Sequence, residues 1–462
     1  MYGTIAAIST PPGKGGVAII RMSGSEARDI LSRVFTPVSG LSVGELRPRV
    51  QYYGYIIYNN ERIDDGLATV FPAPHSYTGE DVVEISCHGG TLVSHTVLEA
   101  LFHAGAIPAT AGEFTRRAYI NGRLTLTDAE AIGNLLEARS REQMRLAAAP
   151  ARTRLKTEIE GIRTELVTLL GSIYARIDYP DEDLGELSDG EILDALERVR
   201  ARLTRLISTY RTGKAITEGI SAVICGKPNV GKSTLYNLIL GEDAAIVTDI
   251  PGTTRDLLER SVPLGRVMLR LTDTAGIRYG EATEGVEAIG VERSVKRIAA
   301  ADLVIAVFDL SRPLDGEDGN VLSAIGGATG AKICILNKAD LASEAFDREK
   351  IDSLFDTVIT ASAREGEADC LRLLTDAIDR AFTDEKISTS TDAIVASVRQ
   401  HSSLSRALEL VDAAIAAFAA GMPVDAASSD VELALGAIGE LDGRSVSENV
   451  TNDIFSRFCV GK

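Results

Sequence analysis

The sequence predicts a multidomain α+β protein: an N-terminal α+β domain, then an all-helical domain with an α/β domain inserted into it. Three changes of pattern along the 462 residues predict this. Short β-forming runs with Gly and Pro occupy residues 1–118, and amphipathic helical patterns occupy 119–218 and 382–462. Apolar strands alternate with helix-length stretches over 219–381. This length suits about three domains, and insertion at a surface loop costs little because domain termini often lie close together.

In the N-terminal segment, turn residues separate several strand-like runs. These runs are TIAAISTP, GVAIIRMSG, RVQYYGYIIY, DDGLATVFPAP and EDVVEISCHGG. Residues 92–104 have helical spacing instead. We therefore expect a sheet with at least one helix packed on it.

The helical segments repeat apolar residues every three or four positions, as amphipathic helices do. Ser188 and Glu191 form a predicted capping box, and Pro150 predicts a break or kink. The apolar positions are Ile159, Ile162, Leu166, Leu169, Ile173, Ile192, Leu196, Val199, Leu203, Leu206, Tyr210, Val395, Val398, Leu404, Leu408, Val411, Ile415 and Phe418.

The composition bears on where in the cell the protein works and on how it could bind nucleic acid. No apolar run approaches the roughly 18–20 residues that span a bilayer, and the N-terminus does not have the pattern of a secretory signal. Five scattered cysteines fit a reduced, cytoplasmic protein. The net charge of −18 argues against coating nucleic acid by bulk electrostatics, so RNA contact would need a local basic surface or a partner.

A glycine-rich loop follows the strand SAVIC, at the start of the α/β segment. Residues 226–233 read Gly-Lys-Pro-Asn-Val-Gly-Lys-Ser, the pattern G-x-x-x-x-G-K-S. Backbone N–H groups of such a loop cradle phosphates, Lys232 would reach the β- and γ-phosphates, and Ser233 would ligate Mg2+. The alternative is a plain glycine turn between strand and helix. The predicted phosphate-site residues are Asn229, Val230, Gly231, Lys232, Ser233 and Thr234.

Further motifs at strand ends predict that the nucleotide is GTP. The Asp340 carboxylate can accept hydrogen bonds from guanine N1 and N2, and the Lys338 stem would cover the base. Asp273 would hold Mg2+ through water, and Thr254 would supply a second hydroxyl. Together these motifs resemble those of Ras-like, translation-factor-type GTPases. The downstream residues are Thr248, Asp249, Ile250, Pro251, Gly252, Thr253, Thr254, Asp273, Thr274, Ala275, Gly276, Asn337, Lys338, Asp340, Ser362 and Ala363.

The group that positions the attacking water is not the glutamine found in Ras. Ile277 follows the D-T-A-G string, and an apolar side chain cannot orient water. Residue chemistry leaves four candidates open, each of which could equally be a solvated carboxylate: Glu281, Glu284, Glu287 and Glu292. Asn229 could offer an oxygen to a monovalent cation or simply form a local turn.

Over essentially its whole length the sequence resembles the MnmE (TrmE) family of tRNA-modification GTPases. At the N-terminus the resemblance rests on TIAAISTPPGKGG, PAPHSYTGED, HGG and GEFTRRA. Further along it rests on DYPDED, TDIPGTTRD and the C-terminal FCVGK. The resemblance implies a folate-binding-like N-terminal domain, a helical domain and an inserted Ras-like G domain.

The resemblance also implies specific sites. K+ would be held by Asn229, Thr248, Ile250 and Thr253 between paired G domains, and Glu287 would orient the water. A 5-formyltetrahydrofolate, or a related tetrahydrofolate, would contact four positions: Arg21, Glu84, Arg123 and Lys462. Arginine at 123 departs from the lysine expected there but keeps the charge.

The implied assembly is a homodimer through the N-terminal domain that joins MnmG, in a heterotetramer, to modify C5 of the wobble uridine of tRNA. Basic stretches 139–163 and 198–214 alternate with acids, so tRNA would be held largely through MnmG. Cys459 is either a chemical thiol or an anchor for the tail. Two rival functions are a ribosome-assembly GTPase switch and a folate-dependent one-carbon transferase.

Overall fold

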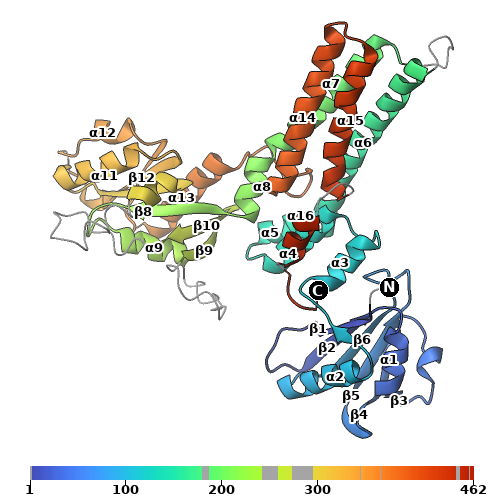
Figure 1. Cartoon of the computed structure of the whole chain (residues 1–462). Coiled ribbons are helices and arrows are strands. Elements are labelled where there is room, and N and C mark those ends of the chain that lie inside the picture. Colours follow the sequence, from blue (N-terminus) through green and yellow to red (C-terminus); the bar gives the residue numbers. More distant parts are fainter. Residues whose placement is uncertain are drawn as a thin grey trace. The chain divides into compact units, whose positions relative to one another are not determined.

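The structure is a computed structural model that describes residues 3–178, 187–241, 259–272, 295–343, 345–364, 366–443, 448–456 and 458–461 (Figure 1). The chain divides into two compact units. One comprises Met1–Glu137 with Leu435–Lys462, and the other comprises Ala138–Ala434. The C-terminal stretch therefore belongs to the same unit as the N-terminal domain.

The first unit is built on a seven-stranded sheet of order β3-β4-β5-β6-β2-β1-β7. Its neighbours pair antiparallel except β1 and β7, which are parallel. The predicted strand runs are all present, whereas the short strands β3 and β7 were not predicted. The strands are β1 (Ile5–Ile8), β2 (Val17–Ser23), β3 (Phe35–Pro37), β4 (Tyr52–Tyr58), β5 (Glu61–Phe71), β6 (Val82–His88) and β7 (Ile107–Pro108).

Two helices, α1 (Ala27–Val34) and α2 (Thr91–His103), cover one face of this sheet. Because side chains alternate along a strand, Ile20 and Met22 of β2 enter the core beneath them, while Arg21 lies on the opposite face. The predicted helix at 92–104 is confirmed as α2. Arg21 and Glu84, two of the residues predicted to contact a folate, lie on the opposite face.

The end of the chain packs onto the first unit. Phe455 and Phe458 form a small core with Leu126 and Ala129 of α4 (Leu126–Glu137). Farther along, Val460 bridges to Ala111 in antiparallel fashion. The remaining helices of this unit are α3 (Glu113–Ile120) and α16 (Glu448–Ser456).

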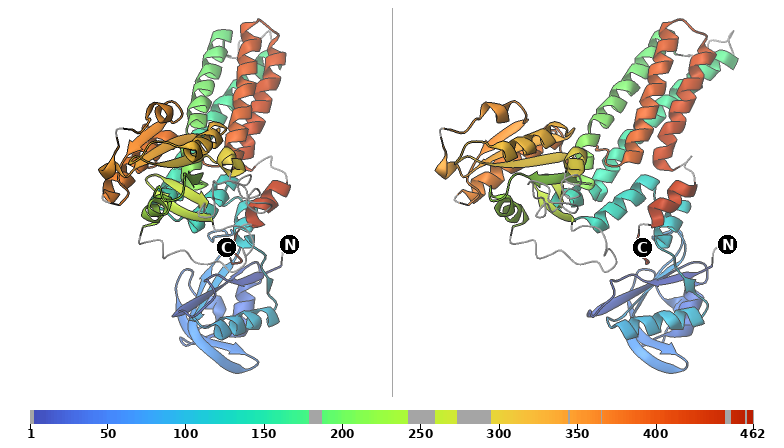
Figure 2. Two further views of the ribbon diagram at one scale, coloured as in Figure 1. Left: turned by 90° about the vertical axis from the view of Figure 1, so that its left-hand side faces the viewer. Right: turned by 60° about the vertical axis from the view of Figure 1, so that its left-hand side comes forward.

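In the second unit, α6, α7 and α14 lie side by side (Figure 2). The predicted capping box at Ser188 is present, and a break falls before α6, whose second residue is Pro150. The periodic positions of α6 and the first five of α7 are buried as predicted. The helices are α5 (Arg141–Ala147), α6 (Ala149–Asp178), α7 (Asp189–Ser208), α8 (Tyr210–Thr217), α14 (Val398–Ala419) and α15 (Val424–Asp442), of which α15 belongs to the second unit only up to Ala434.

One predicted core position of the helical pattern is wrong. Val398 is 57% exposed because it is the first residue of α14, directly after the capping residue Ser397. The buried positions of that helix start with Gln400. A hydrophobic residue in the first turn matches the spacing of the pattern without having a neighbouring element to pack against.

The α/β domain in the second unit has a six-stranded sheet of order β13-β12-β11-β8-β10-β9. The five predicted strands pair in parallel, and an antiparallel edge strand, β9, that was not predicted completes the sheet. The strands are β8 (Ile220–Cys225), β9 (Glu259–Leu264), β10 (Val267–Thr272), β11 (Leu303–Asp309), β12 (Ala331–Asn337) and β13 (Thr357–Thr360). The helices are α9 (Lys232–Leu240), α11 (Gly316–Gly326), α12 (Glu349–Asp352) and α13 (Glu367–Phe382).

A tight contact joins α8 to the segment that returns from the α/β domain. The Val395 N–H donates to Thr209 Oγ1 over 3.0 Å, and a Cβ at Gly213 would lie 2.0 Å from the Val395 carbonyl oxygen. Only glycine allows this approach of the helix and the returning segment.

We predict that Gly213→Ala lowers the free energy of unfolding by about 1–3 kcal/mol, because the added methyl group must push two backbones apart. Gly171→Ala is the matched control: Gly171 is exposed in α6, with no atom within 4 Å of its Cβ position. That change should be neutral or stabilise by up to about 1 kcal/mol through helix propensity. Urea unfolding followed by circular dichroism measures both, and equal effects would contradict the packing argument.

Candidate nucleotide-binding site

The parallel strands of the α/β domain deliver the predicted motifs to one edge of the sheet. β8, β11, β12 and β13 all run in the same direction, so their carboxyl ends meet there. The glycine-rich loop follows β8, Asn337 ends β12, and Ser362 lies just beyond β13. In open α/β sheets this edge is where ligands bind.

The glycine-rich loop has the backbone that its residues allow. Asn229 has φ 65° and Gly231 has φ 108°, both left-handed. A Cβ at Gly231 would lie 2.0 Å from Asn337 Nδ2, so no side chain fits there. The loop then enters α9, whose first residues are the predicted ligands Lys232, Ser233 and Thr234. Both hydroxyl residues are exposed, as a ligand to an incoming ion requires.

Lys232 folds back onto its own loop. Its ammonium group donates to the carbonyl oxygens of Gly226, over 2.7 Å, and Lys227, over 2.6 Å. Burial lowers the pKa of Lys232 below the ordinary lysine value. A phosphate group brought to this ammonium would favour its charged form.

The side chain of Asn337, at the end of β12, hydrogen-bonds to two loops and is not directed into solvent. Its buried amide donates to the Val230 carbonyl over 2.8 Å and accepts from the Ala363 N–H over 2.9 Å. The phosphate loop, β12 and the 362–363 loop are therefore held in one arrangement. Asp340, in the short 3-10 helix Ala339–Leu341, is exposed and available to a ligand.

Sequence reasoning missed one residue of this edge, Asp309. It ends β11 and is 7% exposed, and its carboxylate accepts from Lys338 Nζ over 2.5 Å. Burial raises the pKa of Asp309, but hydrogen bonds from Lys338 and Ser311 outweigh this and lower it overall. An acid at the end of an otherwise apolar strand was the available signal.

Several predicted residues lie outside the described residues, and their roles stay predictions. They are Thr248, Asp249, Ile250, Pro251, Gly252, Thr253, Thr254, Asp273, Thr274, Ala275, Gly276, Glu287 and Lys462.

In the N-terminal domain, two of the predicted folate residues meet. Arg21 Nε donates to Glu84 over 2.9 Å across neighbouring strands, and the guanidinium carbon lies 5.6 Å from the Tyr77 ring centroid. Arg123 lies beside the turn at Gly79, where an added Cβ would be 3.3 Å from its Cγ. Arg21, Glu84 and the Tyr77 ring therefore lie close together, with an acid, a guanidinium group and an aromatic ring side by side.

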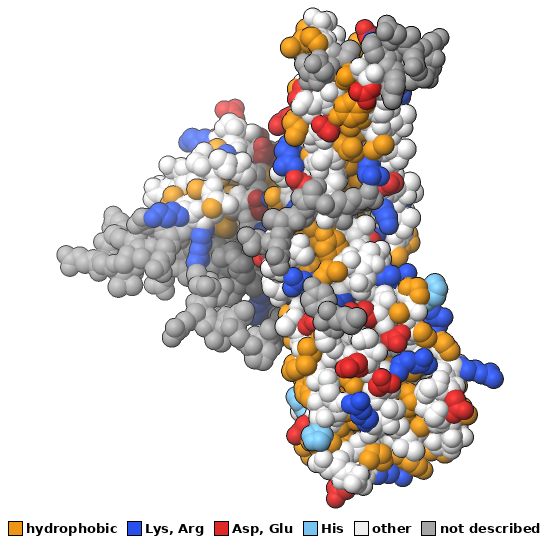
Figure 3. Space-filling view, turned by 45° about the vertical axis from the view of Figure 1, so that its right-hand side comes forward, with side chains coloured by type: hydrophobic (Ala, Val, Ile, Leu, Met, Phe, Trp, Pro, Cys, Tyr) orange, Lys and Arg blue, Asp and Glu red, His pale blue; other side chains and the backbone are white. Residues whose placement is uncertain are grey.

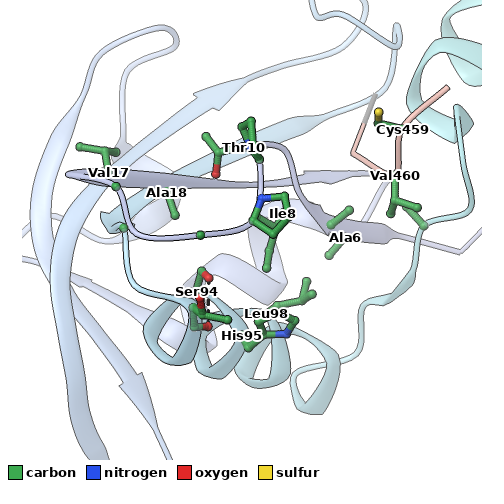
Figure 4. Close-up of a pocket in the computed structure, with 18 of the residues that line it drawn as sticks. Ala6, Ile8, Thr10, Val17, Ala18, Ser94, His95, Leu98, Cys459 and Val460 are labelled. Carbon is green, nitrogen blue, oxygen red and sulfur yellow. Dashed lines mark hydrogen bonds between the residues drawn. The ribbon is translucent and has the colours of Figure 1, made fainter. Parts of the chain in front are cut away.

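A separate cavity of about 780 Å³ lies in the same unit (Figure 4). β1, the loop at 10–15, α2 and the C-terminal tail line it, and Arg21 and Glu84 do not. Ser94, His95 and Leu98 of α2 face Ile8 and Ala6 across it. Cys459 borders this cavity and is exposed, whereas the other four cysteines are buried.

The described residues hold no cluster of three or more His, Cys, Asp or Glu side chains suited to a metal ion. Among the helices within those residues, none combines the length and apolar character needed to cross a membrane.

Almost the whole of this chain is similar to known proteins. It matches the family described as MnmE helical domain over residues 126–459, and that described as GTP-binding protein TrmE N-terminus over residues 4–123. It is 40% identical over 462 residues to the tRNA modification GTPase MnmE of Thermotoga petrophila, covering 99% of this chain and 100% of that protein. The corresponding protein of Acetivibrio thermocellus is 38% identical over 463 residues, with 99% of each chain covered.

Among solved structures, the G domain of the FeoB iron transporter of T. maritima is 22% identical. The match covers 34% of this chain and 97% of that one, with a TM-score of 0.26, too low to carry an argument.

We predict that Asp340→Asn weakens GTP binding by about 100-fold or more, because the new amide NH2 group opposes the guanine amino group and a hydrogen bond to a carboxylate, worth about 1.5–3 kcal/mol, is lost. Binding of XTP should improve, since the xanthine C2 carbonyl can accept from the new amide. Competition against a fluorescent GDP analogue measures both affinities. An equal loss for GTP and XTP would contradict recognition of the base by Asp340.

Proposed function

Because this chain belongs to the MnmE family of tRNA-modification GTPases, we propose that it acts with MnmG on C5 of the wobble uridine of certain tRNAs. The group installed would be aminomethyl or carboxymethylaminomethyl. The chain itself is a GTP hydrolase of tRNA modification. The convergence of the phosphate loop, Asn337, Asp340 and the 362–363 loop at one sheet edge supports the use of GTP, and membership of the family supports the tRNA reaction.

In GTP hydrolysis, the residues of this edge would position the nucleotide. Backbone N–H groups of the phosphate loop hold phosphate oxygens, Lys232 exchanges its two carbonyl partners for phosphate, and Asp340 selects guanine. Ser233 and Thr254 would hold Mg2+, which neutralises charge developing on the β- and γ-phosphates. The exposed Ser233 hydroxyl at the start of α9 fits this role.

The absence of a Ras-type glutamine calls for another catalytic arrangement. We infer that paired G domains of a homodimer enclose K+, held by Asn229, Thr248, Ile250 and Thr253, and that Glu287 orients the water. Asn229 is exposed and has a left-handed backbone, so its side chain is accessible to a ligand. A cation at this position would supply the positive charge that an arginine finger supplies elsewhere.

For the one-carbon chemistry we propose a tetrahydrofolate, such as 5-formyltetrahydrofolate, at Arg21, Glu84, Arg123 and Lys462. A carboxylate such as Glu84 suits the N–H donors of a pterin, and guanidinium groups suit the glutamyl carboxylates. The ion pair of Arg21 with Glu84, 2.8 Å at its shortest, places both on one face. Cys459 is proposed as an accessible thiol in the same unit.

We propose that tRNA is held largely by MnmG, in a cytoplasmic heterotetramer. The basic stretches of the helical domain are engaged within the chain: Arg198 pairs with Glu165 and Arg202 with Glu158. On the face in Figure 3, Lys and Arg side chains are interspersed with Asp and Glu. Such alternation is typical of a solvated helix surface.

The first prediction concerns the product. In cells that lack this chain, nucleoside mass spectrometry of bulk tRNA should show loss of the C5-substituted wobble uridine, restored by wild type but not by Asp273→Ala. Asp347→Ala, which removes an exposed carboxylate paired with Lys350 in the same domain, is the control and should restore it. An unchanged modification profile would discard the tRNA role and favour the ribosome-assembly switch, or the folate-dependent transferase if GTP hydrolysis also proved dispensable.

The second prediction concerns K+. At matched ionic strength, GTP hydrolysis should be at least about tenfold faster in KCl than in NaCl, since a well-placed positive charge is worth about 10³-fold or more in these enzymes. Asn229→Ala should remove the difference while leaving GDP affinity nearly unchanged. Equal rates of the wild type in the two salts would refute the potassium site.

A further inference from the structure

A buried lysine of the phosphate loop contacts the start of α11 through its side chain. Lys227, directly after Gly226, has a side chain only 6% exposed. Its ammonium group pairs with Asp315, and lies 3.4 Å from Asp318 Oδ2 and 3.7 Å from Glu317 Oε2. A lysine this deeply buried is rare unless paired, so its three acidic neighbours account for it.

The acids around Lys227 are themselves fixed. Asp315 caps α11: its carboxylate accepts from the N–H groups of Glu317 and Asp318, and its own N–H donates to Asp318 Oδ2. Asp318 is 3% exposed, so it has almost no access to water. The Lys227 ammonium holds the pKa of Asp315 at about 2. The Asp315 carboxylate therefore stays charged at neutral pH.

Further ion pairs extend this cluster toward Lys338, which is expected to cover the guanine base. Arg312 lies between two acids, with Nη1 3.3 Å from Asp315 Oδ2 and Nε 3.5 Å from Asp309 Oδ2. Asp309 in turn accepts from Lys338, the residue expected to cover the base. Acids and bases thus alternate from Lys227 in the phosphate loop to Lys338, and we call these five residues and Asp318 the ion-pair chain.

We propose that the ion-pair chain positions the phosphate loop relative to the base-binding loop, with Lys227 and Asp318 as positioning residues for nucleotide binding. The backbone carbonyl of Lys227 also accepts from Lys232, so displacement of Lys227 moves a partner of the phosphate-binding lysine. This proposal rests on the guanine-nucleotide site described above and adds residues that touch neither base nor phosphate through their side chains.

The test separates positioning from mere stability. Lys227→Gln and Asp318→Asn should each weaken binding of a fluorescent GDP analogue by about tenfold, while the double variant should lose little more than the worse single one, because both break the same contact. Lys227→Met with Asp318→Leu replaces the buried pair by apolar groups, a change that often preserves or raises stability. If these residues position the loop, this variant should have the melting temperature of the wild type but should still bind GDP weakly.

Arg312→Ala tests the link to the base-binding side. It should weaken GDP binding about threefold in the wild type, and not at all in an Asp309→Asn background, because the chain is already broken there. Arg372→Ala is the matched control, since Arg372 pairs only with acids of its own helix, Asp369 and Asp376, among the ion pairs of the described residues.

Three outcomes would overturn the proposal: recovery of GDP affinity in the apolar double variant, strictly additive effects of the single changes, or equal effects of Arg312→Ala and Arg372→Ala. A wild-type protein that binds no GDP would instead refute the nucleotide site itself, so the two failures are distinguishable.

Discussion

The side-chain amide of Asn337 is the contact on which the geometry of the nucleotide site depends. It joins the Val230 carbonyl to the Ala363 N–H, and Gly231 must lack a side chain to make room for it. Because the amide is buried, its loss would leave a backbone carbonyl and an N–H without partners, at a cost of about 1–3 kcal/mol each. The phosphate loop, the end of β12 and the 362–363 loop, which are far apart in sequence, are thus held at fixed distances from one another before any nucleotide binds.

In the N-terminal domain, the alternation of side chains along β2 separates two environments. Ile20 and Met22 of β2 enter the core beneath α1 and α2, while Arg21 between them faces Glu84. The C-terminal tail is anchored through its backbone: the Cys459 carbonyl accepts from the Gly112 N–H, and Val460 bridges to Ala111. The Cys459 side chain is nevertheless exposed. Of the two expected roles, a chemical thiol or an anchor of the tail, the backbone of Cys459 fulfils the second, and its exposed thiol leaves the first open. Whether the thiol takes part in chemistry stays a prediction.

Local patterns predicted what local physics determines. Apolar strand runs and the capping box at Ser188 depend on neighbouring residues in the chain, and they were found where expected. The antiparallel edge strand β9, the exposure of Val398 and the packing of the tail on the N-terminal domain depend on partners distant in sequence. The same holds for Asp309, whose importance comes from Lys338, just beyond the adjacent strand β12.

The resting position of Lys232 shows why the rest of the phosphate loop must be rigid. Two carbonyl oxygens of its own loop satisfy its ammonium group, and burial lowers its pKa. A phosphate must therefore replace existing hydrogen bonds, so the net gain on binding is the difference between two sets of contacts. That difference is large only if the loop holds its shape when the carbonyls are released. Contacts on the far side of the loop, from Asn337 to Val230 and from Lys227 to α11, can resist this rearrangement.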